Sequence, residues 1–359
     1  MQDVLGTMSG TSMDGVDAAV LTTDGVRIGG FGASAFRPYS EGERRAIAAA
    51  AGCWPGDPGV AEAARVVEDA HAALCADLPG DAIGFHGQTL AHDPGGRGTH
   101  QAGDGGRLAA RLGRRTVWDF RSADVAAGGQ GAPLAPAFHF AAIRWAGLRS
   151  AAVLNLGGVA NLTWIDGGAE APEDPAAMLA FDTGPASALL DDMMQARLGR
   201  PRDDGGRLAA TGTVDERLVE RFLASPYLSR TAPKSLDRDD FRFLAGAADE
   251  LPPGDAAATL TAISAAGIAA GFRLLPARPD RLLVAGGGRR NAAMMAMIAE
   301  RAGVPAVPVE EVGLDGDMLE AQAFAFLAAR VMAGLPITFP GTTGIAAPAT
   351  GGRISPPGG

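Results

Sequence analysis

The chain has 359 residues, of which 47% are hydrophobic and 20% are charged, as in ordinary globular proteins. At this length, two domains or two lobes of one fold are more usual than a single core. The formal net charge of −10 disfavours nucleic acid and anionic membrane surfaces as partners, because both would repel the chain.

Three further features favour a cytoplasmic protein without a membrane partner. Two cysteines, Cys53 and Cys75, are too few for a disulfide framework in a chain of this length. Residues 1–7 contain neither the basic nor the apolar segment of a signal peptide. The least polar stretch, residues 256–272, is expected to be too short and too polar to span a bilayer.

In chain order, the first part of the sequence predicts strands, then helices, then strands again. Short apolar or alternating segments between glycine-rich turns predict strands, and apolar periodicity of 3.6 residues predicts helices. The expected strands are residues 4–8, 17–22, 27–36, 82–85 and 116–118, and the expected helices are residues 41–51 and 60–78.

The pattern starts again near residue 151. Strand–glycine-turn–strand segments near Gly6 and near Asn155 suggest a duplicated architecture with a cleft between two lobes, and strands that alternate with helices indicate the α/β class. The expected strands are residues 152–156, 159–165, 178–181 and 282–285, and the expected helices are residues 214–224, 239–248, 256–275, 291–302 and about 317–332.

These elements predict an N-terminal lobe at residues 1–150 and a C-terminal lobe at residues 151–345. Residues 346–359 are rich in glycine and proline and are expected to form a surface tail, which lies on the surface or frays.

Glycine-rich turns carry the strongest chemical signal in the sequence. Walker phosphate loops, zinc signatures and nucleophile elbows are absent. What remains are three turns, at residues 6–17, 155–163 and 285–291, each of which follows a strand. Glycines let backbone N–H groups approach phosphate oxygens closely. Any one turn is more easily read as a tight hairpin, but three in this order favour a nucleotide site.

The order of the motifs resembles that of the anhydro-N-acetylmuramic acid kinases. The resemblance begins with Met-Ser-Gly-Thr-Ser-Met-Asp-Gly-Val-Asp at residues 8–17 and covers essentially the whole chain. Its other segments are residues 85–89, 119–121, 124–134, 155–163, 181–185, 233–235, 286–291 and 320–325.

This resemblance implies the α/β, two-lobed, actin-like ATPase fold of sugar kinases, actin and Hsp70, with ATP and Mg²⁺ in the interdomain cleft. It implies a bacterial enzyme of peptidoglycan recycling, and a homodimer. The implied reaction opens the 1,6-anhydro ring of 1,6-anhydro-N-acetylmuramic acid and phosphorylates O6, which yields N-acetylmuramic acid 6-phosphate and ADP.

The resemblance also implies roles for individual residues. Asp182 would be the catalytic base, and Asp14 would hold Mg²⁺ through water. The ATP-binding residues would be Gly10, Thr11, Ser12, Met13, Asp14, Gly15, Val16 and Asp17 in the first turn, Gly157, Gly158 and Asn161 in the second, and Gly286, Gly287 and Gly288 in the third, beside the nucleoside. The sugar would contact Gln88, Thr89, Arg121 and Glu320.

The catalytic and metal assignments each have a structural alternative. Asp182 could be an aspartate favoured near a helix start, with Pro185 as the first helical residue. Asp14 could cap its own turn. Glu320 could complete an Asp-x-x-Glu capping box with Asp317 at the start of the last helix.

The sugar contacts have alternatives of the same kind. Arg121 could hold the lactyl carboxylate by a bidentate contact, or form a surface salt bridge. Gln88 and Thr89 could donate to the sugar or satisfy a turn. One departure from the family is that Ala186-Ser187 follows Asp-Thr-Gly-Pro where Gly-Asn is usual.

Two other functions stay open at this point. A kinase for a simpler anhydrosugar, such as levoglucosan, would need no cation like Arg121, because that sugar lacks the lactyl and N-acetyl groups. A non-catalytic nucleotide-dependent module of the same fold would bind ATP without sugar-stimulated ADP release.

Overall fold

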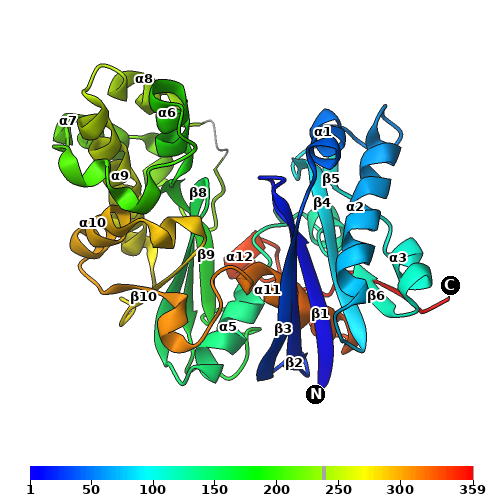
Figure 1. Ribbon diagram of the computed structural model, residues 1–359. Helices are drawn as coiled ribbons and strands as arrows, with labels where there is room; N and C mark the ends of the chain where they lie inside the picture. Colours follow the sequence, from blue (N-terminus) through cyan, green and yellow to red (C-terminus); the bar gives the residue numbers. More distant parts are fainter. Residues whose placement is uncertain (237–239, 359) are drawn as a thin grey trace. The chain divides into compact units, whose positions relative to one another are not determined.

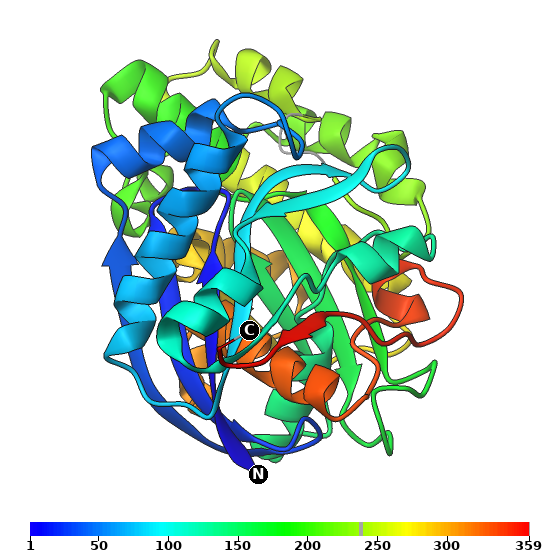
Figure 2. The same cartoon turned by 90° about the vertical axis from the view of Figure 1, so that its right-hand side faces the viewer.

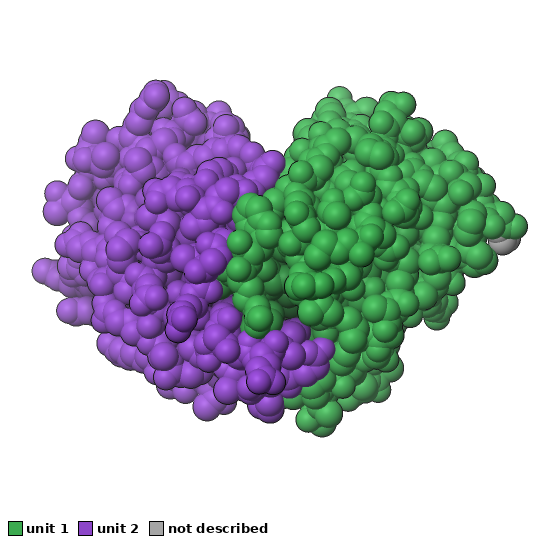
Figure 3. Space-filling view, turned by 90° about the horizontal axis from the view of Figure 1, so that it is seen from below, with its two compact units in different colours: residues 1–145, 318–359 green, residues 146–317 purple. Residues whose placement is uncertain are grey.

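The computed structural model describes residues 1–236 and 240–358, which divide into two compact units. Unit 1 contains Met1–Trp145 and Met318–Gly359, and unit 2 contains Ala146–Asp317 (Figure 3). The first boundary, between Trp145 and Ala146, lies near the expected residue 150. The expected C-terminal lobe to residue 345 is cut short, because the chain from Met318 on, including the last long helix α11 (Leu319–Met332), packs in unit 1 (Figure 1).

Unit 1 is built on a mixed sheet. Its described strands lie in the order β12-β6-β4-β1-β2-β3, with β5 paired to β4. Strands β1, β2 and β3 form an antiparallel meander, while β4 is parallel to both β1 and β6. The strands are β1 (Gln2–Ser9), β2 (Gly15–Thr23), β3 (Ile28–Pro38), β4 (Ala82–Asp93), β5 (Gly98–Ala102), β6 (Arg115–Trp118) and β12 (Arg353–Ser355).

Two glycines explain why α11 lies in unit 1. A Cβ on Gly6 of β1 would lie 1.9 Å from the carbonyl oxygen of Ala321, and a Cβ on Gly84 of β4 would lie 2.3 Å from that of Phe324. Both glycines are therefore needed for the α11 backbone to lie directly on the strands. Because side chains alternate along a strand, the neighbouring residues Leu5 and Phe85 enter the core on the other face.

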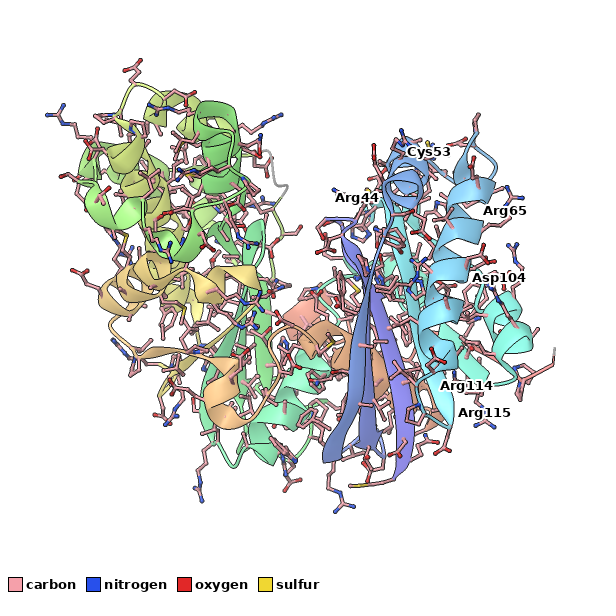
Figure 4. All side chains as sticks on the ribbon, viewed as in Figure 1. Arg44, Cys53, Arg65, Asp104, Arg114 and Arg115 are labelled. Atoms are coloured by element: carbon pink, nitrogen blue, oxygen red, sulfur yellow. The ribbon has the colours of Figure 1, made fainter. Side chains whose placement is uncertain are left out.

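The other face of this sheet is covered by helices before β4 and after β5. Helix α2 (Val60–Ala76) contributes much of this core, beside α1 (Glu41–Ala49). The guanidinium of Arg114 donates to the carbonyl oxygens of Cys75 and Leu78 at the C-terminal end of α2 (Figure 4). These bonds hold Arg114 against the last turn of α2 and the residues just after it.

The chain end lies in unit 1, and most of its described residues from 346 to 358 are exposed. Strand β12 pairs with β6, and Figure 2 shows this segment (red) crossing unit 1. Upstream, α12 (Pro340–Thr343) is tied to the loop after α4 (Ser122–Ala126). The Thr343 hydroxyl donates to the Asp124 carboxylate in α4 at 2.7 Å, and the Thr343 carbonyl accepts from the Gln130 N–H in the following loop at 2.7 Å. Helix α3 (Gly105–Leu112) and α5 (Pro136–Trp145) complete the unit.

Unit 2 contains a second sheet in the order β11-β10-β7-β8-β9. Strands β7, β8 and β9 are antiparallel, and β10 lies parallel to β7 and to β11. The expected strand–turn–strand repeat is therefore present in both units. The strands are β7 (Ser150–Leu156), β8 (Val159–Asp166), β9 (Met178–Pro185), β10 (Leu282–Ala285) and β11 (Ala306–Pro308).

Helix α9 (Pro253–Gly271) forms the centre of the unit 2 core. With the turn after it, the helix spans Pro253–Leu274, which is long and apolar enough to cross a membrane by length and composition. The expectation that this stretch is too short was therefore wrong. Most of the helix is buried against its neighbours, however, as in the core helices of globular proteins, so its length alone is weak evidence for a span.

The remaining helices of unit 2 surround α9 and follow the predicted order. The helix expected at residues 239–248 is described from Arg242, and Asp239 lies outside the described residues. These helices are α6 (Ala188–Leu198), α7 (Glu216–Leu223), α8 (Arg242–Ala248) and α10 (Ala292–Ala302). The mixed strands and helices of both units confirm the predicted α/β class.

Candidate active site

The first glycine turn joins β1 to β2 in unit 1. The Met13 N–H donates to the Gly10 carbonyl at 3.1 Å, and the Ser12 hydroxyl donates to an Asp14 carboxylate oxygen at 2.9 Å. Met13 has a positive φ of 53°, which is unusual for a residue other than glycine. A Cβ on Gly10 would meet only the Ser12 hydroxyl oxygen, at 3.6 Å. Packing within the chain therefore does not require glycine at position 10.

The rest of the predicted phosphate segment divides into exposed and buried residues. Thr11 and Asp14 are exposed at the turn, whereas Val16 is fully buried in the core. A Cβ on Gly15 would lie 2.5 Å from the Phe36 ring, so packing accounts for this glycine. Asp17 is half-buried on β2. Only the outer part of the segment is thus placed to meet a ligand.

Gln88 is buried and bound to this turn. Its Oε1 accepts from the Ser9 hydroxyl at 2.5 Å, and its Nε2 donates to the Gly10 carbonyl at 3.1 Å. The structure therefore uses the Gln88 amide to fix the first turn against β4. The next residue, Thr89, accepts from the Gln101 amide at 3.2 Å.

Arg121 lies just after β6 and binds neutral groups. Its Nε and Nη2 donate to Nε2 of His86 at 3.1 and 2.9 Å, and its Nη1 donates to the Gly131 carbonyl at 2.7 Å. The His86 Nδ1 lies 2.8 Å from the Gly87 carbonyl, which requires a proton on Nδ1 and leaves Nε2 as the acceptor. Among the described residues, Arg121 has no carboxylate in salt-bridge contact, so the surface salt bridge of the alternative interpretation is not found there.

The charge of Arg121 is retained despite its surroundings. Burial lowers the pKa of Arg121 to about 10, against the opposing charges of Glu320 and Asp124. The guanidinium therefore stays charged at neutral pH. Sequence reasoning missed His86 as its partner, although His86 lies in β4 and Arg121 follows the neighbouring parallel strand β6.

Glu320 lies in the first turn of α11, and the expected capping box is absent. Helix α11 has Met318 at its N-cap, without a side-chain cap hydrogen bond. Asp317 instead pairs with Arg289 at 3.0 Å in unit 2. The Glu320 side chain is exposed, and its charge acts on Arg121.

A cavity of about 180 Å³ lies near these residues in unit 1. Aromatic and polar side chains line it, and Asp119 has a φ of 55°, which is unusual for a residue other than glycine. Its lining residues include His86, His100, Gln101, Trp118 and Asp119, none of which the sequence singled out as a site residue.

The second turn, Gly157–Gly158, joins β7 to β8 in unit 2. Neither glycine has a positive φ, and a Cβ on either would make only ordinary contacts, the nearer at 3.5 Å. The turn's carbonyls bind the start of α6: the N–H groups of Ala186 and Ser187 each donate at 3.0 Å, and the Ser187 hydroxyl donates to Gly157 at 2.9 Å. Ala186-Ser187 therefore fits where the family usually has Gly-Asn.

The third turn, Gly286–Gly288, follows β10. Gly286 has a φ of 76°, and its Cβ would lie 2.4 Å from the Asn155 side-chain oxygen. A Cβ on Gly288 would lie 2.6 Å from that of Leu156. Packing against β7 thus explains two glycines of this turn, whereas a Cβ on Gly287 would have no atom of another described residue within 4 Å, apart from its chain neighbours.

Asp182 lies within β9, not at its end. The strand continues to Pro185 and α6 begins at Ala188, so the reading of Pro185 as the first helical residue was wrong. Oδ1 accepts from Asn161 Nδ2 and Oδ2 accepts from the Leu236 N–H, both at 2.9 Å. Burial raises the pKa of Asp182, and these two hydrogen bonds oppose the increase. Neutral donors therefore orient the carboxylate and favour its ionised form.

The main chain of Asp182 is also held. Its N–H donates to the Lys234 carbonyl at 2.9 Å, and its carbonyl accepts from the Tyr227 hydroxyl at 2.6 Å. The sequence motif at residues 233–235 marked this segment without indicating its role.

The residues present are compatible with Mg²⁺. Within residues 1–236 and 240–358, no group of three or more His, Cys, Asp or Glu side chains could hold a metal by itself. Mg²⁺ in phosphoryl-transfer sites is commonly held by one or two carboxylates together with substrate phosphates. Asp14, an exposed carboxylate on the first glycine turn, fits that mode of binding.

Known proteins identify the family. A family model described as anhydro-N-acetylmuramic acid kinase matches residues 2–357. The chain is 61% identical over 355 residues to the anhydro-N-acetylmuramic acid kinase of Cereibacter sphaeroides, covering 98% of this chain and 96% of the relative. It is 55% identical over 355 residues to anhydro-N-acetylmuramic acid kinase 1 of Jannaschia sp., covering 98% and 95%.

A solved structure is similar at a greater distance. The activator of the 2-hydroxyisocaproyl-CoA dehydratase from Clostridium difficile, with bound ADPNP, has 11% identity and a TM-score of 0.46, covering 92% of this chain and 96% of that chain. A likeness this distant carries no argument. The match to the family model and the two close relatives, by contrast, extend over nearly the whole chain: it belongs to the anhydro-N-acetylmuramic acid kinase family and is a kinase.

Proposed function

We propose that Asp182 is the general base of an ATP-dependent reaction that opens the 1,6-anhydro bridge and phosphorylates O6. Membership of the family makes the chain a kinase of cell-wall recycling, which converts 1,6-anhydro-N-acetylmuramic acid to N-acetylmuramic acid 6-phosphate. The observation that carries the proposal is the Asp182 carboxylate, which receives one neutral hydrogen bond on each oxygen.

The reaction combines two bond changes. Water attacks C1 as the C1–O6 bond breaks, and a base must take the water's proton because water is a weak nucleophile at an acetal carbon. The released O6 bonds to the γ-phosphorus in line, and ADP leaves. Asp182 takes the proton and later passes it to solvent. The donors from Asn161 and Leu236 hold the carboxylate in one orientation and favour its ionised form beforehand.

The glycine turns support the assignment of the ATP phosphates. Packing explains Gly15, Gly286 and Gly288, but it does not explain Gly10, Gly157, Gly158 and Gly287. A missing side chain without a packing reason fits the close approach of a ligand to the backbone. We assign the phosphates to the turns containing Gly10 and Gly157–Gly158, and the nucleoside to Gly287.

Asp14 is the proposed Mg²⁺ ligand, through water. Mg²⁺ bound there would neutralise charge on the transferring phosphoryl group. The Ser12 hydroxyl, which donates to Asp14 at 2.9 Å, would hold that carboxylate in place.

Arg121 is the proposed partner of the lactyl carboxylate, with Thr89 and Glu320 on the same side of the sugar. Three of its five N–H groups are used by His86 and Gly131, so two N–H groups stay available to an anion. Gln88 contributes by fixing the first turn, because its amide is already bonded within unit 1.

Isotope labelling tests the coupled reaction. In water labelled with ¹⁸O, the label should enter at C1 of the product and be absent from the phosphate group, because the phosphate acquires the former bridge oxygen. Recovery of ¹⁸O in the phosphate would contradict the mechanism.

A substrate panel tests the sugar. With coupled ADP detection, the muramic sugar should turn over faster than levoglucosan. Faster turnover of levoglucosan would favour the simpler-sugar alternative, and ATP binding without sugar-stimulated ADP release would favour a non-catalytic module.

We further propose a homodimer in the cytoplasm, as the family resemblance implies. Light scattering of the purified chain should give twice the mass of one chain, and the mass of a single chain would contradict the dimer.

A further inference from the structure

Lys234 links two parts of a loop in unit 2. The loop follows α7, which ends at Leu223, and is described over residues 224–236. The Lys234 ammonium donates to the carbonyl of Tyr227 at 3.1 Å and lies 3.5 Å from that of Leu228. It also lies 4.5 Å from the centroid of the Tyr227 ring, a favourable cation–π position. The ammonium is thus an internal link within the loop.

Both linked parts of the loop contact Asp182. The Tyr227 hydroxyl donates to the Asp182 carbonyl, and the Lys234 carbonyl accepts from the Asp182 N–H. Two residues after Lys234, the Leu236 N–H donates to the carboxylate itself at 2.9 Å. The loop therefore holds Asp182 at its amide, its carbonyl and one carboxylate oxygen.

The residue type is unusual for this chain. Lys234 is the only lysine among 31 basic residues, and only 8% of it is exposed. An ammonium is a compact charge that can approach two carbonyls and a ring face, whereas a guanidinium is a wide planar fork. Burial lowers the pKa of Lys234, as expected for an enclosed ammonium, and the neighbouring Arg230 lowers it further.

We propose that Lys234 is a positioning residue for the catalytic base: its ammonium holds the loop so that the Leu236 N–H stays aimed at the Asp182 carboxylate. This inference rests on the proposed role of Asp182. Lys234 acts through the loop, and it makes no contact with the carboxylate by its own side chain. Its loss should therefore affect the chemical step more than the binding of either substrate.

The network also predicts a change in pH dependence. The carboxylate faces the neutral donors Asn161 and Leu236, and the nearby charges, Lys234, Arg230 and Asp240, act on the Tyr227 side. Loss of the Leu236 donor removes a bond that favours the ionised carboxylate, so the pKa of Asp182 should rise further. Because the base must be ionised, the acidic limb of kcat should move to higher pH.

The experiment compares Lys234→Met with Arg230→Met in the full-length enzyme. Arg230 lies on the same loop and over the same ring, at 5.6 Å, so it controls for the loss of one local positive charge. For Lys234→Met we expect kcat to fall on the order of 10²-fold, the cost of a small misplacement of a catalytic group. The KM values for ATP and sugar should change little, and the acidic limb should shift upward.

Two further variants keep the test decisive if Lys234→Met folds poorly. Tyr227→Phe retains the ring but removes the hydroxyl bond to Asp182, and should lower kcat without changing either KM. Lys234→Arg retains the charge, and should recover only part of kcat. Thermal unfolding of each variant shows whether unit 2 remains folded.

Several outcomes would overturn the inference. A normal kcat and pH profile in Lys234→Met, or equal losses in Lys234→Met and Arg230→Met, would exclude a positioning role specific to Lys234. Full activity of Lys234→Arg would show that charge alone suffices. Substantial activity of Asp182→Asn would instead contradict the proposed base itself, so failure of the two ideas is distinguishable.

Discussion

Arg121 in unit 1 and Arg289 in unit 2 both follow the end of a strand, but Arg289 pairs with carboxylates whereas Arg121 is bonded to neutral groups. Arg289 pairs with Glu310 at 2.8 Å and Asp317 at 3.0 Å, so two carboxylates neutralise it. Arg121 donates to a neutral histidine, His86, and to the Gly131 carbonyl. Burial lowers the pKa of Arg121 to about 10, whereas the pKa of Arg289 is raised because its two carboxylates outweigh burial.

This difference distinguishes Arg289, whose charge has a structural role, from Arg121, whose charge remains available to a ligand. Neutral partners orient a charged group without cancelling its charge, whereas two carboxylates occupy the fork of Arg289. Asp182 follows the same rule as Arg121, because Asn161 and Leu236 orient it as neutral donors. We therefore expect substitution of Asp182 or Arg121 to affect catalysis, and substitution of Arg289 to affect mainly stability.

The largest expected effect is that of Asp182→Asn. Asparagine keeps the shape but cannot accept a proton as a base, so kcat should fall by about 10²–10⁴-fold. Both substrates should still bind, which calorimetry can measure separately from turnover. A near-normal kcat would show that Asp182 is not the general base.

Arg121→Met should have the next largest effect, and only on the muramic sugar. Loss of a hydrogen-bonded charge typically costs about 1.5–3 kcal/mol, so kcat/KM should fall roughly 10- to 100-fold. Levoglucosan, which has no lactyl carboxylate, serves as the control substrate. Equal losses on both sugars would indicate that Arg121 only supports His86 and the loop at Gly131.

The glycines offer a matched pair of alanine variants. A Cβ on Gly288 would lie 2.6 Å from Leu156 Cβ, so Gly288→Ala should destabilise unit 2 by about 1–3 kcal/mol. Gly10→Ala meets nothing closer than 3.6 Å, so it should leave stability nearly unchanged while weakening ATP binding. Thermal unfolding and nucleotide titration measure the two effects. Normal ATP affinity in Gly10→Ala would show that the first glycine turn does not bind the ATP phosphates.

The smallest expected effect is on the pH dependence of stability in Arg289→Met. Burial acts to raise the pKa of Glu310 and of Asp317, but hydrogen bonds from Arg289 outweigh it, so both pKa values are lowered. Groups with lowered pKa stabilise the fold above their unfolded pKa, and this stability is lost as pH falls through the folded values.

Removal of Arg289 should therefore reduce stability at neutral pH and flatten its decline below about pH 4.5, the region where carboxylates titrate. The carboxylates are 45% and 48% exposed, so the loss should be at most about 1 kcal/mol. Denaturant unfolding at pH 7 and pH 4 measures it. An unchanged difference between the two pH values would show that these ion pairs contribute nothing to stability.

Much of the fold could be predicted because it depends on local pattern. Alternation and glycine turns located β1–β4, β6 and β7–β10, and periodicity located the long helices to within a few residues. The short strands β5, β11 and β12 were missed, and β4 continues to Asp93, beyond its predicted end at residue 85. Element ends were less certain: β9 runs on to Pro185 and α11 begins without its expected capping box. Those ends depend on partners elsewhere in the chain, such as Arg289 for Asp317.

The sequence by itself determined the candidates for chemistry: the order of three glycine turns, the position of Asp182 in its motif, and a single lysine among many arginines. Tertiary structure alone decided how they are held. Leu236 lies 54 positions from the carboxylate it binds, and α11 joins unit 1 because Gly6 lets its backbone approach β1. The local sequence pattern indicates the secondary structure that a segment prefers. Hydrogen bonds and backbone packing between distant segments form only in the folded tertiary structure.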